Sequence, residues 1–130
     1  MINNMKLEHI ALTINYQDEI LNFYQGVLGM ELIRTFTLNS ELANTIFKIN
    51  HDVPVYLLKK NSLVLEVFVS TEDKYQNFNH ICISVSHRES FVQNAADRNY
   101  TFIRKERDYG DLIFLSDLSG NMFEIKEMVS

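Results

Sequence analysis

Short stretches in which apolar and polar residues alternate recur along the chain and predict mainly β structure. In segment 7–14, Ile10, Leu12 and Ile14 fall on one side and the less apolar residues on the other, which is the two-residue period of a strand. The same kind of pattern predicts seven further strands, at 31–38, 53–60, 63–70, 78–86, 102–107, 112–116 and 122–128.

Two longer segments have apolar residues at helical spacing. In 17–28 they recur every three or four residues, acidic residues stand in the first turn and Gly29 follows the end, so an amphipathic helix is expected. Segment 88–99 predicts a second helix, and Ser40 is a candidate N-cap for a short helical turn within 39–51. The order strand, helix, three strands therefore occurs twice, which predicts an α+β fold.

The two halves also align with each other. At an offset of 71 residues His9 aligns with His80, and at an offset of 58 residues Glu66 aligns with Glu124. The offsets differ by 13 residues (71 minus 58), about the length of the 39–51 segment that the second half lacks. Histidine and glutamate are residue types that ligate metals, so this repeat indicates more than a shared fold.

These four residues lie on the less apolar faces of their predicted strands, and each half would aim one imidazole and one carboxylate into a shared concavity. Glu66 and Glu124 have apolar neighbours, and burying an unpaired carboxylate costs several kcal/mol. A divalent cation shared with His9 and His80 would meet this demand with a site charge near zero. The alternative is a metal-free polar network of the same residues.

Composition and charge exclude several other classes. The net charge of the 130 residues is -5, without a basic stripe, so nucleic acid is not an expected partner. No apolar run reaches the roughly 18 to 20 residues of a membrane span, and the first residues do not resemble a secretion signal, so no membrane partner and a cytoplasmic location are expected. Cys82 is the single cysteine, which excludes an intramolecular disulfide and a cysteine-based zinc site.

Five segments occur in this order along the chain: LEHIALTI, FYQGVLGMEL, LVLEVFV, NHICISV and DLSGNMFEIKE. They resemble the vicinal oxygen chelate superfamily, which includes glyoxalase I, methylmalonyl-CoA epimerase, bleomycin-resistance proteins and extradiol dioxygenases. The resemblance covers nearly the whole chain. It implies a single glyoxalase-like domain over 1–130, with two tandem βαβββ modules, at about 5–70 and 77–129, whose curved mixed sheets form a cup.

The resemblance implies that His9, Glu66, His80 and Glu124 hold a divalent metal ion: Ni, Co, Zn, Mn or Fe. The His, Glu, His, Glu order is similar to that of bacterial glyoxalase I, which implies a lyase or isomerase. Such an enzyme acts on a small-molecule substrate with vicinal oxygens through an enediolate, with Glu124 as the catalytic base and Glu66 as the second candidate. Dioxygenases of the family use two His and one Glu, so Glu66 argues against oxygen chemistry.

Two alternatives stay open, a metal-free small-molecule-binding protein of the bleomycin-resistance type and an enzyme similar to methylmalonyl-CoA epimerase. Family members commonly pair their modules between chains, so the resemblance implies a homodimer whose site forms within one chain or between two. Arg34, Lys59 and Arg104 are candidates for binding an anion in place of the unmatched glutathione-binding residues. Two further expectations are that Cys82 is a small core residue and that His51 is solvated surface.

Overall fold

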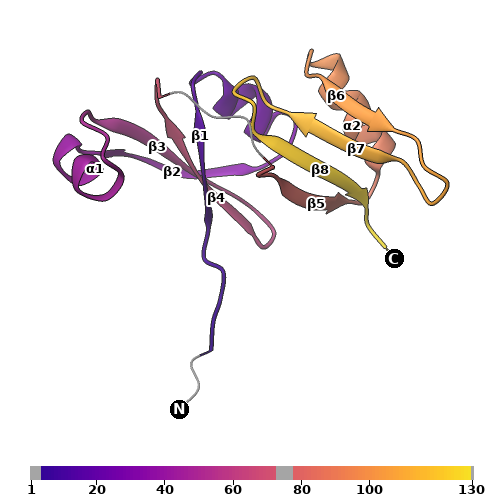
Figure 1. Ribbon diagram of the computed structural model, residues 1–130, viewed down its shortest axis with the longest axis horizontal. Coiled ribbons are helices and arrows are strands. Elements are labelled where there is room, and N and C mark those ends of the chain that lie inside the picture. Colours follow the sequence, from indigo (N-terminus) through magenta and orange to yellow (C-terminus); the bar gives the residue numbers. More distant parts are fainter. Residues whose placement is uncertain (1–3, 73–77, 130) are drawn as a thin grey trace.

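The computed structural model describes residues 4–72 and 78–129 and contains two four-stranded mixed sheets (Figure 1). The strands of the first sheet are β1 (Ile10–Ile14), β2 (Glu31–Leu38), β3 (Val53–Lys60) and β4 (Leu63–Val69). The strands of the second sheet are β5 (Ile81–Val85), β6 (Phe102–Lys105), β7 (Leu112–Ser116) and β8 (Met122–Glu127).

Both sheets have the same topology. The first has the order β1-β4-β3-β2 and the second the order β5-β8-β7-β6. In each sheet the first and last strands of the module pair in parallel, and the other neighbours are antiparallel. The expected α+β fold of two βαβββ modules is therefore confirmed, and β1 and β5 are the equivalent edge strands.

Strands β2, β3 and β7 have the boundaries that the alternation predicts, whereas the other five are shorter than expected. β1 begins at Ile10 rather than residue 7, and β5 begins at Ile81 rather than residue 78. The reason is pairing, because the ladder between β1 and β4 begins at Ile10 and that between β5 and β8 begins at Ile81. The alternation of apolar and polar residues thus extends past the residues that pair with a neighbouring strand.

Each module has one helical segment between its first two strands. In the first module this is the π-helical turn η1 (Ile20–Gln25), where the α-helix 17–28 was expected. The apolar stripe was correctly predicted, since Ile20, Phe23 and Tyr24 are buried. The backbone, however, forms hydrogen bonds between residues five apart, as in a π-helix, for example from Gly26 N to Leu21 O at 3.0 Å. The second module has α2 (Arg88–Asp97).

The helix α1 (Ser40–Phe47) lies in the connection between β2 and β3 and has no counterpart in the second module. Its N-cap is Asn39, whose side chain accepts a hydrogen bond from Leu42 N at 2.9 Å, and not Ser40 as expected. In Figure 1, α1 lies at the outer end of the first sheet, away from the second module. The two modules are thus similar in topology but unequal in their connections.

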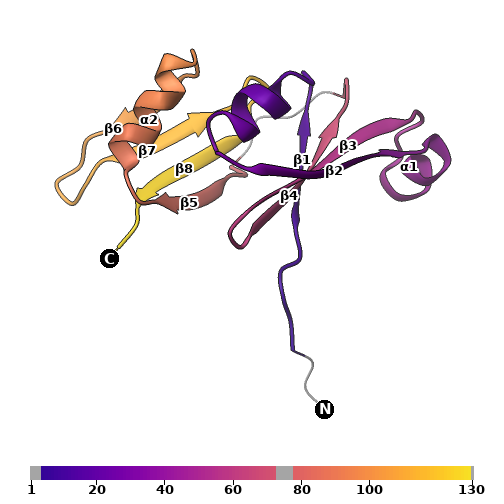
Figure 2. The same cartoon turned by 180° about the vertical axis from the view of Figure 1, so that it is seen from behind.

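One apolar core contains side chains of both modules. Phe23 and Tyr24 from η1 contact the ring of Phe123 from β8, and Phe23 also packs edge-to-face on Tyr100, with ring centroids 4.9 Å apart. Figure 2 shows η1 near the middle of the molecule and α2 over the second sheet. The segments η1 and α2 therefore pack behind the sheets, which leaves the opposite faces for a site.

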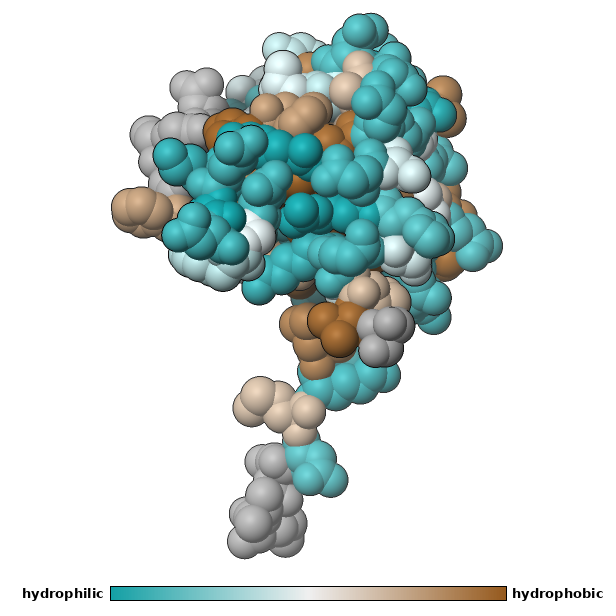
Figure 3. Space-filling model, turned by 90° about the vertical axis from the view of Figure 1, so that its right-hand side faces the viewer, coloured by the Kyte–Doolittle hydropathy of each residue, from teal (hydrophilic) through white to brown (hydrophobic). Residues whose placement is uncertain are grey.

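Figure 3 views the molecule from the side and shows a mostly hydrophilic surface. Residues 4–9, which we call the N-terminal arm, project from the body and are exposed. Among the described residues no helix is long and apolar enough to cross a membrane.

Candidate metal centre

The first predicted pair of ligands is in contact. His9 immediately precedes β1, and Glu66 lies in the middle of β4. Because β1 and β4 are parallel and Ala11 is in register with Glu66, the imidazole two residues before Ala11 reaches the carboxylate on the same face. His9 Nε2 lies 3.3 Å from Glu66 Oε1, and the two side chains are 43% and 20% exposed.

The second pair repeats this geometry in the second module. His80 Nε2 lies 3.4 Å from Glu124 Oε1, and β5 and β8 are again parallel. The imidazole packs edge-on against the ring of Phe114, with centroids 5.3 Å apart, and its Nδ1 lies 2.9 Å from the backbone oxygen of Phe78. A carbonyl oxygen only accepts hydrogen bonds, so Nδ1 carries a proton and donates it there.

A neutral His80 in this tautomer presents the lone pair of Nε2 toward the Glu124 oxygen. Two acceptors that face each other need a proton or a cation between them. Two neighbouring ligands of an octahedral ion, each about 2.1 Å from it, lie about 3.0 Å apart, slightly less than the separations observed here. The donor types and the spacing of each pair, together with the tautomer of His80, therefore fit a divalent ion.

The structure brings together two pairs and not all four residues. Among residues 4–72 and 78–129, no three histidine, cysteine, aspartate or glutamate side chains of one chain come close enough to hold a metal ion. The concavity expected to collect His9, Glu66, His80 and Glu124 is therefore not formed by a single chain. Each pair is carried by an edge strand and its parallel neighbour.

Cys82 is exposed and is not the core residue that was expected. It is in register with Glu124 on β8 and lies on the same face of β5 as His80, so it faces away from the core. Partial burial, and then the negative charge of Glu124, raise the pKa of the thiol. The thiol is consequently less reactive than an ordinary exposed cysteine.

A pocket of about 250 Å³ lies next to the His9–Glu66 pair, between the first sheet and α1. Its floor is formed by Ala11 and Thr13 from β1 and Phe68 from β4, which share the face of His9 and Glu66. Ala43 and Phe47 from α1 form the roof. The remaining lining residues are Leu12, Leu38, Ile49, Val53, Ser70 and Glu72.

Sequence reasoning did not find this pocket, because α1 has no counterpart in the repeat. The available signal was the apolar content of the 39–51 segment together with the position of Phe68, two residues after Glu66 on the same strand face. His51, expected as solvated surface, is only half-exposed, and its Nε2 lies 3.5 Å from Glu72 Oε1 at the pocket rim. The backbone oxygen of Asp52 and the carboxylate of Glu72 raise the pKa of His51.

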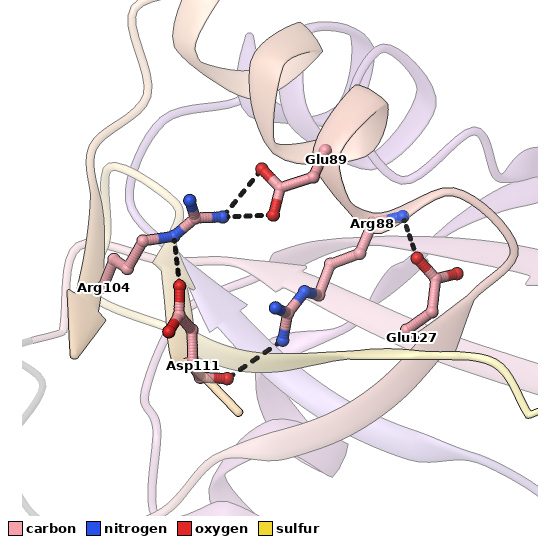
Figure 4. Close-up of polar contacts among 5 residues, drawn as sticks. All are labelled: Arg88, Glu89, Arg104, Asp111 and Glu127. Atoms are coloured by element: carbon pink, nitrogen blue, oxygen red, sulfur yellow. Dashed lines mark hydrogen bonds and ion pairs between the residues drawn. The ribbon is translucent and has the colours of Figure 1, made fainter. Parts of the chain in front are cut away.

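The expected anion-binding role of Arg104 is not supported. Its guanidinium donates to both carboxylate oxygens of Glu89, at 2.6 and 2.8 Å, and lies 3.7 Å from Asp111 (Figure 4). Two carboxylates therefore neutralise Arg104. Arg34 lies over the ring of Phe36, with the guanidinium carbon 5.2 Å from the ring centroid, and neither arginine is among the residues that line the pocket.

The FYQGVLGM and DLSGN segments meet in a buried polar network between the modules. The hydroxyl of Tyr24 donates to Asp117 Oδ2 at 2.8 Å, and Asn121 Nδ2 donates to the same oxygen and to the backbone oxygen of Thr13. Asn15 N donates to Ser119 Oγ at 2.8 Å. These residues connect the turn between β7 and β8 to β1 and η1, so their role is to hold the modules together.

Glu19 belongs to the same buried region. Its carboxylate accepts hydrogen bonds from the hydroxyl of Tyr100 and from Leu118 N, and its side chain is nearly fully buried. Burial raises the pKa of Glu19, and the two hydrogen bonds offset part of this effect. This carboxylate is buried in the core, where both of its hydrogen bonds go to the second module, which assigns it to the fold rather than to the candidate metal centre.

The comparisons with known proteins agree with this architecture. The family model described as Glyoxalase/Bleomycin resistance protein/Dioxygenase superfamily matches residues 6–125. No curated protein matches the chain. The fosfomycin resistance protein FosX from Listeria monocytogenes is 15% identical with a TM-score of 0.73, and the match covers 99% of this chain and 96% of that chain. One FosX structure from that organism contains manganese(II) and 1S,2S-dihydroxypropylphosphonic acid.

Two further structures extend the comparison. FosX from Mesorhizobium loti is 12% identical with a TM-score of 0.69, covering 99% of this chain and 94% of that chain. A glyoxalase family protein from Enterococcus faecalis is 22% identical with a TM-score of 0.65, covering 94% and 97%. At these identities the likeness shows the fold, whereas the family model covers most of the chain. The chain therefore belongs to the Glyoxalase/Bleomycin resistance protein/Dioxygenase superfamily.

Proposed function

We propose that this protein is a metal-dependent lyase or isomerase of the glyoxalase type, acting on a small substrate with two adjacent oxygens. The observation that carries the proposal is the repeated pair: an imidazole nitrogen lies 3.3 Å from a carboxylate oxygen in the first module and 3.4 Å from one in the second. Both pairs stand at the same place in their sheets. A repeated geometry of this kind is better explained by two half sites for one shared ion than by two unrelated ion pairs.

A homodimer would complete the site. His9 and Glu66 of one protomer would bind the ion together with His80 and Glu124 of the partner subunit. The half sites lie at the edge strands β1 and β5, whose free edges can accept another chain. Leu7 is 72% exposed and Phe78 97% exposed, each two residues before its histidine, and a partner that covers these edges would bury both.

The roles of the residues follow from their chemistry. The four ligands would hold Ni, Co, Zn, Mn or Fe, and a bound divalent ion polarises the substrate carbonyl as a Lewis acid. Glu124 would act as the base: its carboxylate takes the proton from the carbon beside the carbonyl and returns it to the neighbouring carbon. Glu66 is the second candidate for this role. The proton is conserved, and the substrate is rearranged without an oxidant or reductant.

Metal binding and turnover test the proposal directly. Calorimetry on chelator-treated protein should show one manganese(II) ion per pair of half sites, and His80→Ala should abolish this uptake. Glu124→Gln should abolish turnover of the hemithioacetal of glutathione and methylglyoxal if the wild type turns it over. Glu127→Gln, on the same strand, should leave metal uptake unchanged. An unmodified protein that takes up no divalent ion and is fully stable in a chelator would contradict the proposal.

A mixture of two variants tests whether the site forms between chains. One variant carries His9→Ala and Glu66→Gln, the other His80→Ala and Glu124→Gln, and neither alone should bind the ion tightly. After random exchange half of the dimers are mixed, and each mixed dimer has one complete site, so about a quarter of the wild-type sites should return. A site within one chain would give no recovery, because every chain lacks one pair.

A metal-free binding protein is the second candidate, favoured by the pocket beneath α1, whose lining needs no ion to hold an apolar compound. This function predicts a thermal shift with a small apolar ligand that is the same in His80→Ala as in the wild type. A shift that requires manganese(II) would instead support the enzyme.

A further inference from the structure

We infer that the pocket beneath α1 binds an uncharged apolar part of the substrate, a phenyl ring or a branched alkyl group, while the adjacent oxygens lie at His9 and Glu66. The inference rests on the proposed function, because it assigns the part of the substrate that does not react. It concerns the residues of this chain that determine substrate specificity.

The pocket and the first ligand pair share one face of the first sheet. Ala11 follows His9 by two residues, and Phe68 follows Glu66 by two residues, so strand alternation places all four on the same side. Ala11 is in register with Glu66, and both Ala11 and Phe68 line the pocket. Residues two apart on a strand are separated by about 7 Å, so one small substrate can span from the ligand pair into the pocket.

The lining determines what the pocket accepts. It is predominantly apolar, and Glu72, the one ionisable residue among the described lining residues, lies at the rim beside His51. With the Glu72 carboxylate at the entrance and no lysine or arginine among the described lining residues, an anionic group such as a phosphonate or the carboxylates of glutathione is disfavoured. A water molecule occupies about 30 Å³, so the pocket volume of about 250 Å³ equals that of about eight water molecules, which is enough for a phenyl ring.

The roof of the pocket has apolar surface that is still exposed to solvent. Ala43 is the one buried residue of α1, whereas Phe47 is 53% exposed and contacts Phe68 edge-on, with ring centroids 5.9 Å apart. The helix is held at its start by Asp52, which accepts a hydrogen bond from Ser40 N at 2.7 Å. An apolar group in the pocket would pack against the inner side of Phe47 and against Phe68, which favours binding.

Two hydroxamic acids test this inference on the manganese(II)-loaded protein. Acetohydroxamic and benzohydroxamic acid present the same pair of oxygens and differ in a methyl against a phenyl group. Calorimetry should give at least tenfold tighter binding of benzohydroxamic acid, since a buried ring removes more apolar area from water. Equal affinity for the two compounds would overturn the inference.

Variants of α1 test whether the preference for benzohydroxamic acid arises in the pocket. Ala43→Leu fills the pocket and should remove the preference for the phenyl compound while the affinity for acetohydroxamic acid is unchanged. Phe47→Ala changes an exposed position, is compatible with folding, and should reduce the preference at least threefold. Leu42→Ala is the matched control, because Leu42 lies on the same helix but does not line the pocket. An unchanged preference in Phe47→Ala would contradict the assignment.

A measurement without metal separates this inference from the proposed function. Benzyl alcohol added to metal-free protein should shift the backbone amide signals of Ala43 and Phe68 in an NMR titration, and acetate should not. If the protein takes up no manganese(II) but these signals still shift, the proposed function is refuted and the pocket assignment stands. If manganese(II) binds and neither signal shifts, the pocket assignment is refuted.

Discussion

The hydroxyl of Tyr24 is expected to stabilise the fold without contributing to the proposed metal centre. It donates to Asp117 Oδ2 at 2.8 Å, and the side chain has 0% exposure, so water cannot replace the bond in Tyr24→Phe. A hydrogen bond to a charged group contributes about 1.5 to 3 kcal/mol. Asp117 keeps three other donors, Ser119 N, Asn121 N and Asn121 Nδ2, so we expect the lower end, a loss of about 1.5 kcal/mol.

This loss corresponds to a measurable shift of Tm. At about 2.1 cal/mol/K per residue, the unfolding entropy of a chain of 130 residues is about 0.27 kcal/mol/K, so a loss of about 1.5 kcal/mol should lower Tm by about 5.5 °C. Urea unfolding should give the same change in the free energy of unfolding. Tyr16→Phe is the control, because Tyr16 is exposed, and it should change this free energy by less than about 0.5 kcal/mol.

Calorimetry with manganese(II) completes the test. Tyr24→Phe should bind the ion as the wild type does, since Tyr24 is in the core between the modules. A variant as stable as the wild type would refute the reasoning about the buried network. A variant of normal stability that has lost the metal would show that the FYQGVLGM segment acts in the site and not in the fold.

Three further predictions concern other residues. Burial raises the pKa of Glu19, so the folded state binds a proton more tightly than the unfolded state, and the free energy of unfolding should fall as the pH rises from about 4.5 through the raised pKa. Urea unfolding between pH 4.5 and 7.5 should show no such fall in Glu19→Gln, and parallel curves for the two proteins would contradict this account. Asn39→Ala removes the N-cap of α1 and should cost about 1 kcal/mol in urea unfolding; no change would mean that α1 does not depend on this cap. Manganese(II) at 100 times its Kd should raise the free energy of unfolding by about 2.7 kcal/mol, and a chelator should reverse this; an unaltered Tm would argue against a metal centre.

The sheets could be predicted from the sequence because strand alternation reports burial directly. The alternation in 31–38 and 53–60 gave the boundaries of β2 and β3, and all eight strands exist. The π-helical turn η1 could not be predicted, since the apolar stripe that buries Phe23 and Tyr24 is common to α- and π-helical backbones. Pairing with a neighbouring strand, which decided where β1 and β5 begin, is not visible in one strand alone.

The candidate site was predictable within each module and not between modules. The repeat placed a histidine and a glutamate on parallel neighbouring strands, and His9–Glu66 and His80–Glu124 are indeed in contact. How the modules pack depends on core side chains such as Tyr24 and Phe123, for which a repeat alignment carries no information. The sequence therefore indicated the two pairs but left open whether they meet within one chain or between two, and within the described residues of one chain the structure keeps them apart.

The presence of α1 in the first module alone has a stereochemical consequence for the proposed enzyme. In the proposed dimer, a site built from one first module and one second module would have the apolar pocket on the side of the first module only and Glu124 on the side of the second. A substrate whose hydrocarbon part is fixed under α1 then presents a single face of its reacting carbon to Glu124. Proton transfer is therefore expected to yield one enantiomer, and the mirror-image substrate could place its oxygens correctly only by leaving the pocket.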